Sequence, residues 1–226
     1  MTLGILRWVT LPIAAVWSLL RLFRRHLRFI VHLGALLPLG WLVWGFFTGN
    51  LTVNPIQEAS QRTGDAALVI LLISLVCSPA ASILGLKEAL KVRRALGLYA
   101  FLYTALHFLI FVGVDYGFRL ALIWDALVEK RFILAGFAAG MILLALAGTS
   151  FDWWKLRLGK NWKRLHRLIY MAGGLAVLHY LWAVKGDIRV PLAAGGALSL
   201  LILLRIPPVK RALILIRYRL RRENIS

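Results

Sequence analysis

The stretch Trp162–Lys185, WKRLHRLIYMAGGLAVLHYLWAVK, is an apolar run that holds two histidines, His166 near its start and His179 near its end. In a helix that rises 1.5 Å per residue, the two imidazoles would lie about 20 Å apart along the axis. An ionisable side chain inside a long apolar segment is costly to place in a membrane, and it is therefore a candidate functional residue. The stretch predicts a membrane-spanning helix that binds something at two depths.

The composition of the whole chain agrees with a membrane protein. Of the 226 residues, 61% are hydrophobic and only 16% are charged, whereas soluble domains carry near a quarter charged residues. Several apolar runs approach the roughly 20 residues that cross a bilayer. The net charge of +19 lies mainly at the ends of these runs, which favours cytoplasmic membrane loops over nucleic-acid binding. Cys77 is the one cysteine, so an intrachain disulfide is excluded.

We expect an all-α integral membrane protein, a bundle of six transmembrane helices whose short connections favour antiparallel neighbours. An interfacial amphipathic segment at 1–29 precedes the bundle, and a basic cytoplasmic tail at 207–226 follows it. Prolines within the spans are tolerated where neighbouring helices satisfy the freed carbonyls. The six spans are expected at 30–47, 66–84, 95–114, 132–150, 165–184 and 190–206.

The distribution of Lys and Arg predicts the orientation of this bundle. The segments on the side of both termini hold 22 of the 28 Lys and Arg residues, and the opposite segments hold six of the nine acids. Because cytoplasmic loops carry the excess of basic residues, we expect both termini in the cytoplasm. The near-neutral outer segments 48–65 and 115–131 are the expected docking surface for a partner.

This topology assigns a depth to each histidine. His107 and His179 lie about 18 and 21 Å from the cytoplasmic ends of the third and fifth spans, which are parallel and could hold one planar cofactor between them. Neutral imidazole is a good axial ligand for haem iron, so the pair favours haem b. Zinc is less favoured because it needs three or four ligands. A proton path or transporter with hydrogen-bonded histidines is the other interpretation.

Three further residues form a candidate inner site near the cytoplasmic side. His166 and His32 match in depth and could bind a second haem, although His32 could equally meet a propionate, a quinone or lipid headgroups. Arg93 precedes His107 by almost four helical turns and offers a bidentate guanidinium to a propionate or another anion. His26, inside an arginine cluster, is expected to be solvated.

Four segments of the chain resemble a known family. They are VHLGALLPLGWLVW at 31–44, NPIQEASQRTGDAAL at 54–68, RRALGLYAFLYTALHFLIF at 93–111 and RLGKNWKRLHRLIYMAGGLAVLHYLWAVK at 157–185. They are similar to the haem-binding membrane subunits of the bacterial periplasmic methionine-sulfoxide reductase system, the MsrQ or YedZ family. The similarity runs from about residue 30 to 190 without large gaps.

The resemblance implies a b-type cytochrome of the bacterial inner membrane, with His107, His166 and His179 at the positions of the family's haem ligands. Such a protein passes electrons to a separate periplasmic molybdopterin-containing subunit that repairs oxidised methionines. The chain itself would then be an electron-transfer subunit and not an enzyme. The donor is the quinone pool or a cytoplasmic flavin reductase, and FMN is associated with the family.

The bundle also resembles, more distantly, the transmembrane domain of ferric reductases and NADPH oxidases. The chain departs from that pattern because Arg93 stands where an inner histidine is expected. An inner haem would need another ligand, such as His32, so the resemblance is compatible with one haem or two. We expect no flavin or nicotinamide domain in residues 207–226. Two alternative functions stay open, a ferric or metal reductase cytochrome and a cofactor-free transporter or scaffold with proton-relay histidines.

Overall fold

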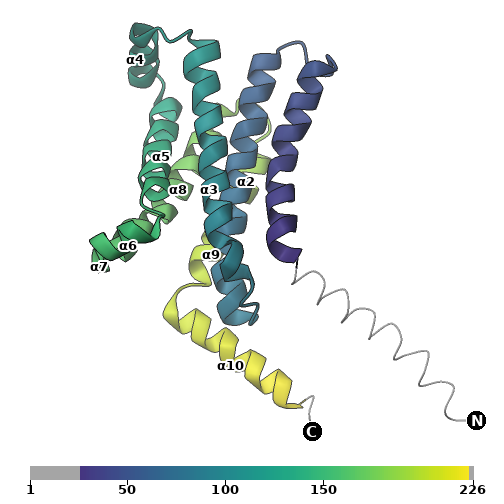
Figure 1. The fold of residues 1–226 in the computed structure, drawn as a ribbon, viewed down its shortest axis with the longest axis vertical. Helices are drawn as coiled ribbons and strands as arrows, with labels where there is room; N and C mark the ends of the chain where they lie inside the picture. Colours follow the sequence, from purple (N-terminus) through teal and green to yellow (C-terminus); the bar gives the residue numbers. More distant parts are fainter. Residues whose placement is uncertain (1–25, 224–226) are drawn as a thin grey trace, which may run out of the picture.

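The computed structural model describes residues 26–223, which fold into helices and short connections with no strand in that range (Figure 1). Residues 1–25 and 224–226 lie outside the described part, and with them most of the expected interfacial segment 1–29. In order, the helices are His26–Phe47, α2 (Pro55–Ile83), α3 (Ala89–Leu109), α4 (Leu120–Glu129), α5 (Arg131–Gly148), α6 (Asp152–Leu158), α7 (Lys160–Leu165), α8 (Ile169–Ala183), α9 (Arg189–Leu203) and α10 (Pro207–Glu223).

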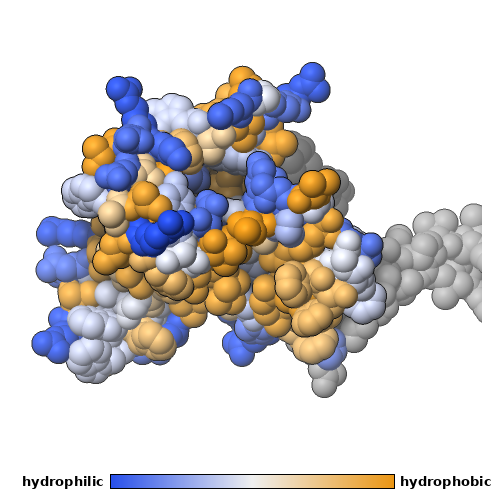
Figure 2. All heavy atoms as spheres, turned by 90° about the horizontal axis from the view of Figure 1, so that it is seen from above, coloured by the Kyte–Doolittle hydropathy of each residue, from blue (hydrophilic) through white to orange (hydrophobic). Residues whose placement is uncertain are grey.

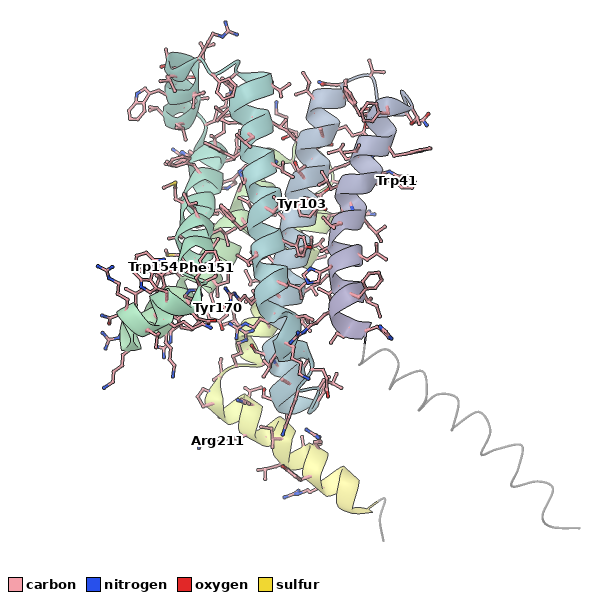
Figure 3. The ribbon with its side chains drawn as sticks, in the orientation of Figure 1. Trp41, Tyr103, Phe151, Trp154, Tyr170 and Arg211 are labelled. Atoms are coloured by element: carbon pink, nitrogen blue, oxygen red, sulfur yellow. The ribbon has the colours of Figure 1, made fainter. Side chains whose placement is uncertain are left out.

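Four helices of the described chain are long and apolar enough to cross a membrane, or five if the bent pair α9–α10 counts as one span. The four are His26–Phe47, α2, the continuous helix Ala89–Asp115 that contains α3, and α5. They correspond to the first four expected spans. Many large apolar side chains of the bundle are exposed, among them Phe29 and Phe47, and the end view shows apolar residues between hydrophilic ones (Figure 2). Trp41, which is 69% exposed, points outward from the first helix (Figure 3). A surface of this kind fits lipid rather than water.

The last two expected spans differ from the prediction. The span expected at 165–184 is not one helix: α7 ends at Leu165, a 3₁₀ turn covers His166–Leu168, and α8 has only 15 residues. The span expected at 190–206 ends at Leu203, and α10 leaves it at an angle of 80°. Pro207 and Pro208 follow this break, and proline suits the first turn of a new helix better than the interior of an old one.

The centre of the bundle is α2, which packs against α3, α8 and α9. One buried cluster joins the first helix, α2, α3, α5 and α8 around Leu71 and Tyr103, and a second joins α2, α8 and α9 around Leu75. In the first cluster, the side chains of Leu71 and Tyr103 are almost completely buried, each 1% exposed. The histidines of the candidate site lie on α3 and α8, the two helices that flank this core.

Two prolines interrupt the backbone hydrogen bonding of the spans, and side chains from other helices bind the affected groups. Pro79 inside α2 has no N–H for the carbonyl of Leu75, and Arg205 donates to that carbonyl instead. Near Pro38, the Tyr103 hydroxyl donates to the carbonyl of Ala35 at 2.7 Å and accepts from the N–H of Leu39 at 3.0 Å. The bundle thereby satisfies backbone groups that would otherwise face hydrocarbon.

Candidate functional site

His107 and His179 face each other in the bundle. His107 lies near the end of α3 and His179 lies near the end of α8. Their ring centroids are 6.0 Å apart, and the ring planes are nearly perpendicular at 82°. The two residues are 72 positions apart in the sequence. The structure therefore brings together the pair that the expected topology places at one depth.

Each of the two imidazoles is held by a backbone carbonyl. His107 donates from Nδ1 to the carbonyl of Ser60 on α2 at 2.8 Å, and His179 donates from Nδ1 to the carbonyl of Phe132 on α5 at 2.6 Å. A carbonyl can only accept, so Nδ1 carries the proton in both rings. The neutral tautomer leaves Nε2 with a free lone pair, which is the arrangement that metal-binding histidines adopt.

Two glycines provide the space in which these rings lie. A Cβ atom on Gly136 of α5 would lie 2.6 Å from Nδ1 of His179, and a Cβ on Gly64 of α2 would lie 3.3 Å from Cε1 and Nδ1 of His107. The first distance is shorter than any real contact of that kind, and the second is tight. A side chain at Gly136 would therefore displace the imidazole of His179.

The chemistry of this pair fits haem. Two neutral imidazoles from different helices, with ring centroids 6.0 Å apart, would offer two nitrogen ligands to one haem iron. Haem supplies the equatorial ligands of its iron and needs from the protein only axial ones, for which imidazole is common. No group of three or more His, Cys, Asp or Glu side chains suited to a metal ion occurs among residues 26–223.

The pair lies toward the outer end of the bundle as the expected topology orients it. His179 is four residues from the end of α8, and its partner Phe132 is the second residue of α5. Just beyond His107, α3 continues as a π-helical turn, Ile110–Asp115. π-helical turns are uncommon in proteins, and many of those that occur lie at functional sites. The two imidazoles therefore lie close to this end of the molecule.

His166 lies in the 3₁₀ turn between α7 and α8, at the opposite end of the bundle from His179. Its ring stacks on Trp162, with centroids 4.0 Å apart and planes at 27°. Its Nε2 lies 3.2 Å from Oγ1 of Thr149, and Trp162 donates to the Thr149 carbonyl at 2.8 Å. These contacts fix the orientation of His166 against the end of α5.

His32 has different neighbours. Its Nδ1 lies 2.9 Å from the hydroxyl of Tyr99 on α3, and the two rings meet edge to face. The helix that carries His32 lies along one edge of the bundle, whereas α6 and α7 project from the opposite edge (Figure 1). The described structure therefore does not bring His32 and His166 together as a pair.

Arg93 joins α3 to α2 at the inner end of the bundle. It donates from Nη1 to the hydroxyl of Ser78 at 2.9 Å, and its carbonyl accepts from the hydroxyl of Ser74 at 3.1 Å. The guanidinium has further N–H groups, because arginine carries five donors. Its place beside an inner cofactor thus stays a prediction from the sequence.

Several residues of the site carried no sequence signal. Ser60 and Phe132 act through their backbone carbonyls, which every residue type possesses. Gly64 and Gly136 are two glycines among the 19 in the chain, and only the fold shows which of them contact imidazoles. A glycine at the depth of a candidate ligand was the one available hint.

The chain matches one protein family and several bacterial proteins along most of its length. The family described as "Ferric reductase like transmembrane component" matches residues 63–177. The chain is 45% identical over 178 residues to a Deinococcus radiodurans protein, with 78% of this chain and 87% of the relative covered. It is 41% identical over 185 residues to a Rhodospirillum rubrum protein, covering 81% and 89%, and 39% identical over 178 residues to one from Caulobacter vibrioides, covering 78% and 85%.

All three relatives are named "Protein-methionine-sulfoxide reductase heme-binding subunit MsrQ". The aligned length covers most of each relative, and the identity is high across it. The segment that matches the ferric-reductase-like family, residues 63–177, contains His107 and His166. The chain belongs to the MsrQ family of heme-binding subunits.

Proposed function

We propose that the chain is a b-type cytochrome that carries electrons across the bacterial inner membrane, with His107 and His179 as the axial ligands of an outer haem. The observation that carries this proposal is the pair of imidazoles with centroids 6.0 Å apart, each with Nδ1 bound to a carbonyl. The bound haem supplies reversible one-electron chemistry. The protein positions the rings and fixes their tautomer.

The electron path follows from the depths of the candidate residues. In the six-span arrangement with both termini in the cytoplasm, electrons enter near His166 and Arg93 and leave near His179. The donor is the quinone pool or a cytoplasmic flavin reductase, with or without FMN. The acceptor is a separate periplasmic molybdopterin-containing methionine-sulfoxide reductase subunit, so the chain transfers electrons and does not itself reduce the substrate. The name shared by the relatives supports a partnership with a methionine-sulfoxide reductase.

His166 is the candidate ligand of an inner haem. It is held by Trp162 and Thr149, and Arg93 at the same end of the bundle would offer positive charge to a propionate. His32 is a weaker candidate because its helix lies along the opposite edge of the bundle from α6 and α7, away from His166 (Figure 1). One haem is therefore proposed at the outer pair, and a second would depend on His166.

The experiment is a reduced-minus-oxidised absorption spectrum and a haem count on the purified protein and its variants. We expect His107→Ala and His179→Ala to lose the same haem, because one axial ligand alone holds it poorly. His32→Ala is the control and should keep the outer haem. If either variant of the pair retains all of its haem, the pairing is wrong. Well-folded wild-type protein without any haem band, even after haem is added, would exclude the cytochrome function.

A ferric or metal reductase is a second candidate, because the matching family is described as ferric-reductase-like. Both functions use the same outer haem and differ in the electron acceptor. Dithionite-reduced protein should be reoxidised faster by the periplasmic reductase subunit with methionine sulfoxide than by chelated ferric iron. The reverse order of rates would favour the metal reductase.

A further inference from the structure

The helix α10 turns away from the bundle at its inner end. It follows α9 after a break and lies at 80° to it. In Figure 1 it runs obliquely beneath the bundle, below the end of α9. Because α9 is the apolar partner of this bent pair, a helix perpendicular to it would run along a membrane surface rather than across the bilayer.

A direct contact fixes the level of α10 relative to the membrane spans. Arg217 donates from Nη1 to the carbonyl of Ile83 at 3.2 Å, and Ile83 is the last residue of α2. The backbone at Gly85, which has a φ of +76°, lies against the same guanidinium. Since α2 is a candidate span, α10 lies at the depth where that span ends. This is the depth of lipid headgroups.

The exposed side of α10 combines positive charge with apolar groups. Leu215, Ile216 and Tyr218 are 60%, 52% and 65% exposed. The basic side chains Arg211 and Arg219 are exposed on the same helix, and Arg211 is seen on α10 in Figure 3. Among residues 26–219, whose side chains the structure describes, no carboxylate forms an ion pair with this helix. A charged, partly apolar helix at headgroup depth is typical of interfacial membrane helices.

The segment α6–α7 projects from the same end of the molecule and has the same character (Figure 1). Arg157 lies over the ring of Trp153 at 5.1 Å, and Trp153 is 57% exposed. The acid Asp152 is bound by Lys155 at 2.6 Å, which lowers the pKa of this carboxyl and offsets its charge. Tryptophan together with Lys and Arg is the usual composition of the membrane interface.

We propose that α10 and the α6–α7 segment form a binding surface for anionic phospholipid headgroups on the cytoplasmic leaflet. The positive charge complements phosphate-bearing headgroups, and the exposed apolar groups can enter the adjacent acyl region. A basic side chain near an anionic surface strengthens binding by roughly fivefold. Removing three such side chains should therefore lower the preference for anionic over zwitterionic lipid by well over tenfold.

The first test measures which lipids remain on the full-length protein. The protein is extracted with mild detergent from vesicles of equal phosphatidylglycerol and phosphatidylcholine, and the retained lipids are counted by mass spectrometry. We expect phosphatidylglycerol to be enriched on the wild type. The variant K210Q/R211Q/R219Q should lose the enrichment, whereas R119Q/K130Q/R131Q, with the same loss of charge at the other end, should keep it. Equal retention of both lipids by the wild type, or equal losses in both variants, would overturn the proposal.

A second test does not depend on charge removal. A fluorophore is attached at Leu215→Cys in a Cys77→Ser background, and the protein is reconstituted in vesicles that contain phosphatidylglycerol. The fluorophore should be shielded from aqueous iodide, and high salt should increase its quenching. Full iodide quenching in vesicles at low salt would instead show a helix in the cytoplasm, free to bind an acidic soluble partner, and would contradict the lipid surface.

Discussion

The absence of a side chain at Gly136 determines whether His179 can take its present position. A Cβ there would lie 2.6 Å from Nδ1 of the imidazole, which is already fixed by the Phe132 carbonyl. The ring cannot move away without breaking that hydrogen bond. Position 136 therefore requires glycine because the imidazole of His179 occupies the space of a Cβ atom, and not because of its backbone conformation.

We predict that Gly136→Ala reduces the outer haem content several-fold. Overpacking of this kind costs about 1–3 kcal/mol, and here the strain falls on His179, a proposed haem ligand. Gly140→Ala, one turn further along α5, is the matched control, because its Cβ would make an ordinary contact of 3.6 Å with Thr104. Haem per protein, measured as the pyridine haemochrome, tests the difference. Equal haem in both variants would argue against the role of Gly136.

Tyr103 offers a second prediction at the level of one residue. Its hydroxyl stands between the carbonyl of Ala35 and the N–H of Leu39, and the side chain is 1% exposed. Tyr103→Phe should destabilise the bundle by about 1–3 kcal/mol, because buried groups lose their partner. Unfolding in a detergent series measures this cost. Tyr99→Phe, which loses only a contact with the exposed His32, should change stability by less than about 0.5 kcal/mol.

At the scale of helices, the end of α9 is joined to α2 and α8 by one arginine. Arg205 donates to the Leu75 carbonyl that Pro79 leaves free and to the hydroxyl of Tyr170, and it lies 4.9 Å over the Tyr170 ring. The proline in α2 is thus tolerated because Arg205, in the break between α9 and α10, donates to the carbonyl that the proline leaves free. A proline on one helix and an arginine more than 120 residues later form one structural unit.

We predict that Arg205→Gln lowers the free energy of unfolding by about 1–3 kcal/mol, since the Leu75 carbonyl is left without a donor in an apolar environment. The exposed Arg211→Gln on α10 removes the same charge without this contact and should have little effect. Unfolding of the two variants in parallel distinguishes the loss of a specific hydrogen bond from the loss of charge. A restored wild-type stability in Arg205→Gln/Pro79→Ala would identify the freed carbonyl as the cause.

The sequence predicts the helices better than their interruptions. Hydropathy over 18 or more residues identifies the helices that contain His107 and Leu71, because each is apolar along its whole length. It does not reveal the 3₁₀ turn at His166–Leu168, which depends on contacts of His166 with Thr149 and Trp162. The 80° bend before α10 was missed for a similar reason, although Pro207 and Pro208 mark its position.

The candidate site could be predicted in part. Matching depths on parallel spans suggested His107 and His179 as neighbours, because rise per residue converts sequence position into depth. The carbonyls of Ser60 and Phe132 could not be anticipated, since a backbone oxygen has no identity in the sequence. The proposed pairing of His166 with His32 rested on depth alone, and depth says nothing about which side of a bundle a residue occupies.

At the scale of the whole molecule, the orientation in the membrane is open to a direct test. With Cys77→Ser as background, we expect Thr52→Cys and Asp187→Cys to react with a membrane-impermeant maleimide in intact cells. Lys160→Cys should react only after the membrane is opened. These outcomes follow from the concentration of Lys and Arg at one end of the molecule.

The Asp187→Cys variant also tests whether α8 crosses the membrane, because this helix has only 15 residues. If α8 spans, Asp187 lies on the same side as Thr52. Labelling of Thr52→Cys without labelling of Asp187→Cys in intact cells would contradict the six-span arrangement. As a control, both cysteines should react with the maleimide after lysis, which shows that each is accessible to the reagent.

The carbonyl contacts of the two histidines bear on how the protein is made. The pair needs α3 and α8 for its rings and α2 and α5 for the oxygens that orient them. Chains are synthesised from the N-terminus, so His179 emerges after the other three helices have entered the membrane. If this pair holds the haem as proposed, cofactor loading is a late step of biogenesis, and acquired haem would indicate that all four helices are in place.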